Sequence, residues 1–161
     1  MRTVLWAAAA CLLVAACSAE DGEEESRCGP SRAEVLVVID GDTVELTDGQ
    51  KIRYLLIDTP ETTKGEPECY GPEAKDFNAE LVLGQTVELK YDVECEDRYG
   101  RLLAYVSVDG REVNSLLVER GFAEVMYLPE TGNGKDRLEE FKALLAEAKA
   151  AGRGRWGYCT D

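Results

Sequence analysis

Three charged side chains, Asp42, Arg53 and Arg101, occupy positions that alternate with apolar residues in segments with the pattern of β-strands. A charge on the apolar face of a strand is costly unless it is paired or bound to a ligand. For any one of them, a place at the end of a strand, where the side chain reaches solvent, is the simpler explanation. Three such residues together favour a site that uses both acidic and basic groups.

A second acidic group follows Arg53 in the run Asp58-Thr59-Pro60-Glu61. With Asp42, this run could supply three carboxylates from two adjacent strand ends. Carboxylates and a backbone carbonyl are ligands that suit a hard cation such as calcium, although the spacing is not that of an EF-hand loop. Taken alone, the run is more often a turn that ends a strand.

The two arginines indicate an anion, because each guanidinium can donate two hydrogen bonds to phosphate oxygens and stays charged. A calcium ion with Arg53 and Arg101 around one phosphate would neutralise the charge that develops during a displacement reaction. The sequence contains no histidine, the commonest general base. Glu61 could therefore orient or deprotonate the attacking water.

Five short apolar segments predict the strands that would position these residues. Asp48-Gly49 and Asp109-Gly110 separate apolar segments in the manner of tight hairpin turns. Short strands at close spacing favour a small barrel over a parallel sheet. The predicted strands are Val35–Ile39, Val44–Leu46, Ile52–Ile57, Val87–Val93 and Leu102–Val108.

Three helices are predicted between and after these strands. The first begins at Gly71-Pro72 and stops at Gly84, and the second spans Val113–Arg120. The third begins at a capping box formed by Asp136 and Glu139 and carries one apolar stripe. We therefore expect an α+β, mainly β fold, a five-stranded OB-type barrel with three helices.

The N-terminal segment has the pattern of an export signal and is excluded from the fold. We expect residues 1–16 to be a signal peptide of the lipoprotein type and Cys17 to be lipidated, because Cys17 stands where the lipoprotein box requires a cysteine. Ordinary cleavage after Ala16 is the alternative. Residues 17–33 are predicted to form an acidic tether, and residues 34–161 the folded domain.

The formal net charge of the chain is −14. Phosphate binding normally draws on an excess of lysine and arginine. Composition alone therefore argues against a nucleic-acid partner, and any such activity has to depend on a local site and on bound cations.

Six cysteines are present, of which Cys11 lies in the signal segment and Cys17 is the expected lipidation site. An even number of remaining cysteines in an exported chain indicates disulfides, and four cysteines permit three pairings. Without CxxC spacing or histidine, a zinc site is not expected. The remaining four are Cys28, Cys69, Cys95 and Cys159.

Several blocks of the sequence, taken together and in order, resemble the staphylococcal nucleases, also called thermonucleases. The likeness covers roughly residues 35–156. The blocks are Ile39-Asp40-Gly41-Asp42-Thr43-Val44, Arg53-Tyr54-Leu55-Leu56-Ile57-Asp58-Thr59-Pro60-Glu61-Thr62, Tyr70-Gly71-Pro72-Glu73-Ala74, Asp97-Arg98-Tyr99-Gly100-Arg101, Val113-Asn114, Gly121-Phe122-Ala123 and Trp156.

The resemblance implies a role for each matching residue. Asp42, Asp58 and the carbonyl of Thr59 correspond to the calcium ligands, and Asp40 is an acidic neighbour of that site. Glu61 corresponds to the residue that acts on the attacking water. Arg53 and Arg101 correspond to the pair that binds the scissile phosphate, while Arg98 and Tyr127 match positions that bind the nucleotide. The family hydrolyses DNA and RNA with little sequence preference and leaves 3′-phosphate ends.

The chain departs from the family's best-known member in three respects. The family has a second tyrosine in its nucleotide pocket, at a position that corresponds to the region of Pro129 in this chain. Its absence affects base stacking or binding of an end group more than the chemistry. The best-known member is basic, whereas this chain is strongly acidic. The affinity of this chain for its substrate is therefore expected to be weak and dependent on divalent cations. The best-known member also lacks the four cysteines of this chain. For this chain we predict a Cys69–Cys95 bridge between the two site loops and a Cys28–Cys159 bridge between the ends.

We therefore expect an exported, calcium-dependent nuclease that acts on DNA or RNA as a monomer, held at the cell envelope by a lipid on Cys17, with no protein partner. One alternative is a non-catalytic nucleic-acid-binding module on the same fold. Degenerate members of the family lose the arginines or Glu61, and this chain keeps them. A surface protein that binds calcium or a partner through its acidic face is the other alternative, and only the net charge favours it.

Overall fold

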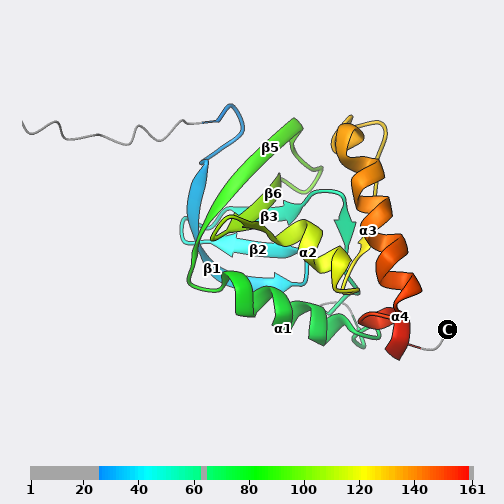
Figure 1. Ribbon diagram of the computed structural model, residues 1–161. Coiled ribbons are helices and arrows are strands. Elements are labelled where there is room, and N and C mark those ends of the chain that lie inside the picture. Colours follow the sequence, from blue (N-terminus) through cyan, green and yellow to red (C-terminus); the bar gives the residue numbers. More distant parts are fainter. Residues whose placement is uncertain (1–25, 63–64, 160–161) are drawn as a thin grey trace, which may run out of the picture.

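The computed structural model describes residues 26–62 and 65–159, and within them five strands close into a β-barrel (Figure 1). The strands are antiparallel in the order β3-β2-β1-β5-β6, and a parallel pairing of β3 with β6 closes the barrel. This confirms the predicted OB-type barrel. The barrel strands are β1 (Arg32–Asp40), β2 (Thr43–Leu46), β3 (Lys51–Tyr54), β5 (Thr86–Glu96) and β6 (Leu102–Val108).

The predicted signal peptide 1–16 and Cys17 lie outside the described residues. The ordered fold extends further toward the N-terminus than the predicted boundary at residue 34, because β1 already begins at Arg32. The segment before β1 is also attached to the barrel, since the N–H of Leu89 in β5 donates to the carbonyl of Ser31 at 2.7 Å.

The three predicted helices are confirmed as α1 (Gly71–Val82), α2 (Val113–Glu119) and α3 (Leu138–Ala150). α1 packs against β1, and α2 packs against both β6 and α3, so the helices cover the barrel from outside (Figure 1). A one-turn helix, α4 (Arg155–Tyr158), follows α3. Among the described residues, no helix is both long and apolar enough to cross a bilayer.

The start of α3 differs from the prediction. Asp136 lies within a short 3₁₀ turn, η1 (Lys135–Arg137), and no side chain caps the first turn of α3. The predicted capping box of Asp136 and Glu139 is therefore wrong. Arg137 stabilises this junction instead, because its guanidinium lies 2.6 Å from a carboxylate oxygen of Glu140 and 2.6 Å from one of Glu112.

Both predicted hairpin turns are present. Asp109 and Gly110 are the two residues between β6 and β7 (Arg111–Glu112), and both have positive φ, 50° and 72°. Asp and Gly tolerate this left-handed backbone, which a two-residue hairpin turn requires. In the turn at Asp48-Gly49, Gly49 has φ 87°, and the N–H of Gln50 donates to Asp48 Oδ1 at 2.9 Å.

The predicted strand Ile52–Ile57 is interrupted in the structure. β3 ends at Tyr54, Leu56 takes a left-handed conformation with φ 63°, and a separate short strand, β4 (Ile57–Asp58), pairs with β8 (Glu124–Val125). The alternation of faces that the sequence predicts across this segment therefore stops at Tyr54. Every residue from Ile52 to Ile57 is buried, so the apolar pattern did not reveal the break.

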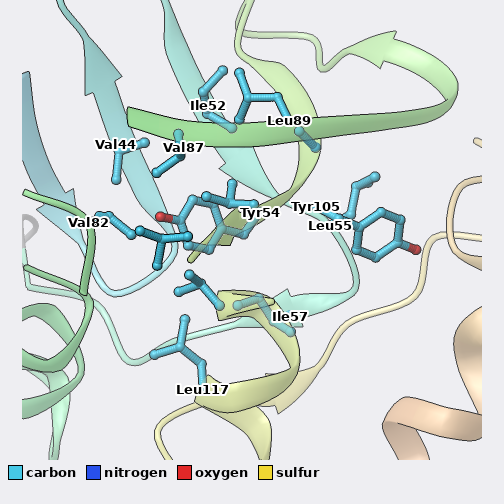
Figure 2. Packing of buried hydrophobic residues seen from close by; sticks show 14 of the residues in the cluster. Val44, Ile52, Tyr54, Leu55, Ile57, Val82, Val87, Leu89, Tyr105 and Leu117 are labelled. Atoms are coloured by element: carbon cyan, nitrogen blue, oxygen red, sulfur yellow. The ribbon is translucent and has the colours of Figure 1, made fainter. Parts of the chain in front are cut away.

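The barrel interior holds a hydrophobic core that the helices complete (Figure 2). The ring of Tyr54 lies near the centre, with Val82 of α1 and Leu117 of α2 contributed from outside the barrel. Burial of one such side chain contributes about 1.5–3 kcal/mol. The Tyr54 hydroxyl donates to Asn78 Oδ1 at 3.0 Å, which links this core residue to α1.

A second buried amide, Asn114 at the start of α2, joins the strands that close the barrel. Its Oδ1 accepts a hydrogen bond from the N–H of Val106 at 2.9 Å. Its Nδ2 donates to the carbonyl of Leu55 at 3.0 Å and to that of Ala104 at 3.3 Å. One side chain thus satisfies backbone groups of β6 and of the turn after β3, which carries the charged residues described next.

Candidate active site

The turn between β1 and β2 places Asp42 inside the protein, where it is 4% exposed. Its Oδ1 accepts a hydrogen bond from the Thr43 hydroxyl at 3.0 Å, and its Oδ2 accepts one from the N–H of Thr59 at 2.8 Å. The N–H of Asp42 donates to Asp40 Oδ1 at 3.2 Å. These donors hold the buried carboxylate in one orientation and join the turn to the loop after β4.

Gly41, between the two aspartates, leaves no room for a side chain. A Cβ atom there would lie 2.8 Å from the side chain of Thr59 and 2.9 Å from the Cβ of Ala74 in α1. The missing side chain allows this turn to pack against both the site loop and α1. The sequence shows the glycine, but only the packing shows why it is needed.

Arg53 organises the turn that interrupts the predicted strand, and it is 7% exposed. Its Nη1 donates to the carbonyls of Tyr54 and Ile57 at 3.0 and 2.8 Å. The same nitrogen lies 3.2 Å from Asp42 Oδ2, and Nη2 lies 2.7 Å from Asp58 Oδ1. One guanidinium therefore fixes two backbone carbonyls and holds together two carboxylates, one from the β1–β2 turn and one from β4.

The acidic residues of this cluster influence one another. Burial raises the pKa of Asp40 to about 6, and the charge of Asp42 adds to the rise. Partial burial also raises the pKa of Asp58, where Arg53 opposes the rise and Asp42 reinforces it. The carboxylates therefore repel each other, which a bound cation would offset.

Arg101 is held by Asp97 in the loop between β5 and β6. Its Nε and Nη2 lie 2.7 and 2.6 Å from Asp97 Oδ2. Asp97 Oδ1 accepts hydrogen bonds from the N–H groups of Tyr99 and Arg101 at 2.8 and 3.1 Å. Burial alone would raise the pKa of Asp97, but these hydrogen bonds outweigh it and the pKa is lowered. Asp97 thus remains ionised and positions the Arg101 guanidinium.

Arg53, Arg98 and Arg101 line one cleft of about 530 Å³. The cleft lies between the end of β5, the Asp97–Arg101 loop and the segment after β8. The structure therefore brings the two arginines proposed to bind the scissile phosphate into one cavity, with Arg98 beside them. The remaining lining residues are Glu94, Glu96, Asp97, Tyr99, Leu103, Met126, Leu128, Glu130 and Thr131.

Tyr99 is a residue of this cleft to which the sequence analysis assigned no role. Its ring is 69% exposed, and the guanidinium carbons of Arg98 and Arg101 lie 4.8 and 5.5 Å from the ring centre. Arg98 Nη2 also donates to the Tyr99 hydroxyl at 2.7 Å. An exposed aromatic ring between two cations can stack on a base. Its position in the sequence between Arg98 and Arg101, two predicted site residues, is the feature by which Tyr99 could have been found.

Tyr127, for which the resemblance implies a role in binding the nucleotide, is not among the described residues that line the cleft, and that role stays a prediction. Tyr127 is half-buried and packs against the hydrophobic core. Its neighbours Met126 and Leu128 line the cleft. Side chains of successive residues in an extended segment point to opposite sides, so Tyr127 faces inward where its neighbours face the cleft.

Glu61 lies in the loop that follows β4, three residues after Asp58. Its N–H donates to Glu68 Oε2 at 3.1 Å, and its carbonyl accepts a hydrogen bond from the N–H of Glu68 at 2.9 Å. Its Oε1 accepts a hydrogen bond from the N–H of Thr62 at 3.1 Å. Among the described residues, Glu61 does not belong to the cleft lining.

The four cysteines form two disulfides, Cys28–Cys95 and Cys69–Cys159. The predicted pairing of Cys69 with Cys95 and of Cys28 with Cys159 is therefore wrong. The Cα atoms of the actual pairs lie 5.0 and 6.0 Å apart, within the reach of a disulfide. Cys69–Cys159 joins the loop after β4 to the C-terminal end of the described chain, and Cys28–Cys95 joins its N-terminal end to β5.

The oxygen atoms of Asp42, Asp58 and Thr59 form a donor set that fits calcium. Calcium takes six to eight oxygen ligands, and water commonly completes the set. Among the residues that the structure describes, no three side chains of His, Cys, Asp or Glu converge to hold a metal by themselves. A calcium ion here would therefore depend on two carboxylates, a carbonyl and solvent.

Known proteins are similar to this chain in sequence. The family model described as "Staphylococcal nuclease homologue" matches residues 51–158. "SPbeta prophage-derived endonuclease YokF" of Bacillus subtilis (strain 168) is 41% identical over 132 residues, which cover 76% of this chain and 44% of that protein. "Endonuclease YncB" of the same organism is 40% identical over 132 residues, with 76% and 62% covered. "Thermonuclease" of Staphylococcus hyicus is 37% identical over 120 residues, 71% of each chain.

The match to the Bacillus proteins spans less than two thirds of their length, while the match to the Staphylococcus protein is more complete. The family model covers the strand that carries Arg53, the loop with Asp58 and Glu61, and the loop with Arg101. The sequence match and the closed barrel agree, and the chain belongs to the staphylococcal nuclease homologue family.

Proposed function

We propose that this protein is a calcium-dependent phosphodiesterase that hydrolyses DNA and RNA with little sequence preference and leaves 3′-phosphate ends. The observation that carries the proposal is the arrangement of Arg53, which lines the cleft beside Arg101 and also holds Asp42 and Asp58 together. The names of the family and of its relatives support hydrolysis of nucleic acid.

In this proposal Arg53 and Arg101 bind the non-bridging oxygens of the scissile phosphate. Both side chains are held before substrate arrives, Arg53 by two carbonyls and Arg101 by Asp97. Donors fixed in advance stabilise the charge of the transition state without reorganising. Asp42, Asp58 and the carbonyl of Thr59 would hold calcium, which when bound supplies further positive charge beside the phosphate.

Glu61 is the proposed general base. Its carboxylate would accept a proton from water while the water oxygen forms a bond to phosphorus and the bond from phosphorus to the 5′ oxygen breaks. The departing 5′ oxygen takes up a proton from solvent, and the phosphate stays on the 3′ side. The paired backbone hydrogen bonds between Glu61 and Glu68 would hold the loop that carries this carboxylate.

Replacement of Glu61 with glutamine should lower kcat by about 10²–10⁴ while calcium-dependent binding of DNA persists, because only the base is removed. The measurement is the initial rate of hydrolysis of single-stranded DNA with calcium and again with a chelator. Glu66→Gln, an exposed position in the same loop, is the matched control and should keep wild-type activity. Failure of the wild-type protein to cleave DNA or RNA in calcium would reject the proposed function, and full activity of Glu61→Gln would reject the role of Glu61.

We also propose that the protein is exported and held at the cell envelope by a lipid on Cys17. Two disulfides support an oxidising compartment, where such bonds persist. Cys17→Ser should move the protein from the membrane fraction to the soluble fraction of cells of the source organism, because the lipid attachment is lost. An unchanged distribution of Cys17→Ser between the two fractions would show that no lipid on Cys17 holds the protein.

A further inference from the structure

The charges of the cleft are unevenly paired. Within the described part of the chain, Arg53 and Arg101 form ion pairs with aspartates, whereas Arg98 forms none. The carboxylates of Glu94, Glu96 and Glu130 also line the cleft, and among the described residues none of them forms an ion pair. The cleft therefore contains one cation without an ion pair, Arg98, and three carboxylates without an ion pair. We call these three carboxylates, of Glu94, Glu96 and Glu130, the acidic rim.

The backbone holds the acidic rim in place. β5 bulges away from β6 between Tyr91 and Glu96, which brings Glu94 to the cleft. The N–H of Glu94 donates to Asn133 Oδ1 at 2.8 Å, and its carbonyl accepts a hydrogen bond from Asn133 Nδ2 at 3.2 Å. Asn133 is buried and ends the loop that carries Glu130, so one amide joins both sides of the rim.

The disulfide Cys28–Cys95 fixes the same end of β5 from the outside. Cys95 lies between Glu94 and Glu96, and Arg27 Nη2 donates to the carbonyl of Val93 at 2.6 Å. These contacts restrain the backbone that carries Glu94 and Glu96. Screening of the rim charges by salt or cations would lower the electrostatic cost of binding a polyanion in the cleft.

We propose that Glu94, Glu96 and Glu130 repel the phosphates that flank the scissile one, so that the cleft binds polymeric nucleic acid well only when those phosphates are screened. The inference depends on the proposed function only in that the ligand is nucleic acid. Binding of nucleic acid by proteins normally weakens as salt rises, because counterions are released. Here the repulsion by the acidic rim is screened over the same range, since the screening length falls to about 10 Å at about 0.1 M salt.

The test compares equilibrium binding of a fluorescent single-stranded oligonucleotide by anisotropy, in calcium, between about 10 mM and about 200 mM salt. The proteins carry Glu61→Gln so that the oligonucleotide stays intact. With the acidic rim present, Kd should stay flat or fall as salt rises. With Glu94→Gln, Glu96→Gln and Glu130→Gln combined, we expect binding about tenfold tighter at the lowest salt and a Kd that rises with salt in the ordinary way.

A matched control carries Glu80→Gln, Asp109→Asn and Glu147→Gln, which change the net charge equally. These exposed residues are on α1, in the β6–β7 turn and on α3, away from the cleft lining. The control should retain the salt response of the protein with its rim intact. A dinucleoside monophosphate, which has no flanking phosphate, should bind equally well with and without the rim substitutions.

Identical salt responses in all three proteins would overturn the inference, as would an equal gain in affinity from the control substitutions. Equal gains for the dinucleoside monophosphate and the polymer would also overturn it, because flanking phosphates would then play no part. Hydrolysis by the wild-type protein is measured separately. If hydrolysis fails while the binding pattern holds, the proposed function is wrong and the role of the rim stands.

Discussion

Replacement of Arg53 with lysine should lower kcat/KM for DNA by about 10²–10³, the usual cost of removing one fixed donor to a transition-state charge. Lysine keeps the positive charge but cannot donate in a fork to phosphate oxygens. It also cannot reach both the carbonyls of Tyr54 and Ile57 and the carboxylates of Asp42 and Asp58, which Arg53 contacts together. The measurement is the initial rate in saturating calcium across a range of DNA concentrations.

Comparison of Arg53→Ala with Arg53→Lys separates the contribution of Arg53 to catalysis from its contribution to folding. Loss of the whole guanidinium leaves Asp42 buried without its charge partner, which costs about 3–5 kcal/mol in unfolding free energy. Arg53→Lys should lose much less, because its ammonium group still offsets that charge. Arg98→Lys, at an exposed position of the same cleft, is the control and should change kcat/KM far less. Wild-type kcat/KM in Arg53→Lys would contradict the assignment of Arg53 to the phosphate.

Asn114→Ala should destabilise the fold by about 2–4 kcal/mol, because it leaves two buried backbone groups without their partner. The N–H of Val106 and the carbonyl of Leu55 bond to this side chain, while the carbonyl of Ala104 keeps a second donor in the N–H of Leu55. Urea unfolding followed by circular dichroism measures the change.

The neighbouring Ser115→Ala provides the control for Asn114. Its hydroxyl donates to the carbonyl of Glu112 at 3.1 Å in a half-buried place, so its loss should cost about 1 kcal/mol or less. Similar losses from the two substitutions would mean that Asn114 does not close the barrel in the way proposed. Because Leu55 lies in the turn that Arg53 organises, Asn114→Ala should also lower activity at temperatures where the protein remains folded.

The sequence predicted those features that depend on neighbouring residues. Gly71-Pro72 placed the start of α1, and Asp109-Gly110 placed a hairpin turn whose backbone few other residues adopt. Asp42 and Arg53 were singled out as charges in apolar surroundings and Asp58 as part of the acidic run after Arg53, and the structure pairs Arg53 with both aspartates. Their roles in catalysis stay predictions.

Other predictions were wrong where contacts with distant parts of the chain determine the local structure. In place of the capping box the chain forms a 3₁₀ turn before α3, where Arg137 pairs with Glu112, a residue of β7. Likewise, only the structure shows that Tyr127 packs against the core while Met126 and Leu128 line the cleft, and the role of Tyr127 in binding the nucleotide stays a prediction. A local pattern contains no information on which of two alternating faces will be covered.

By itself, the sequence of this protein determined its family, its three main helices, its turns and the residue types of its site, because these depend on local backbone preference and on residue order. Only the tertiary structure decided where the strand that begins at Lys51 ends and which cysteines pair. Arg53 and Asn114 break that strand by bonding carbonyls that a continuous strand would use otherwise. Cys28 meets Cys95 because the N-terminal segment runs beside β5, and such proximity arises only when the barrel closes.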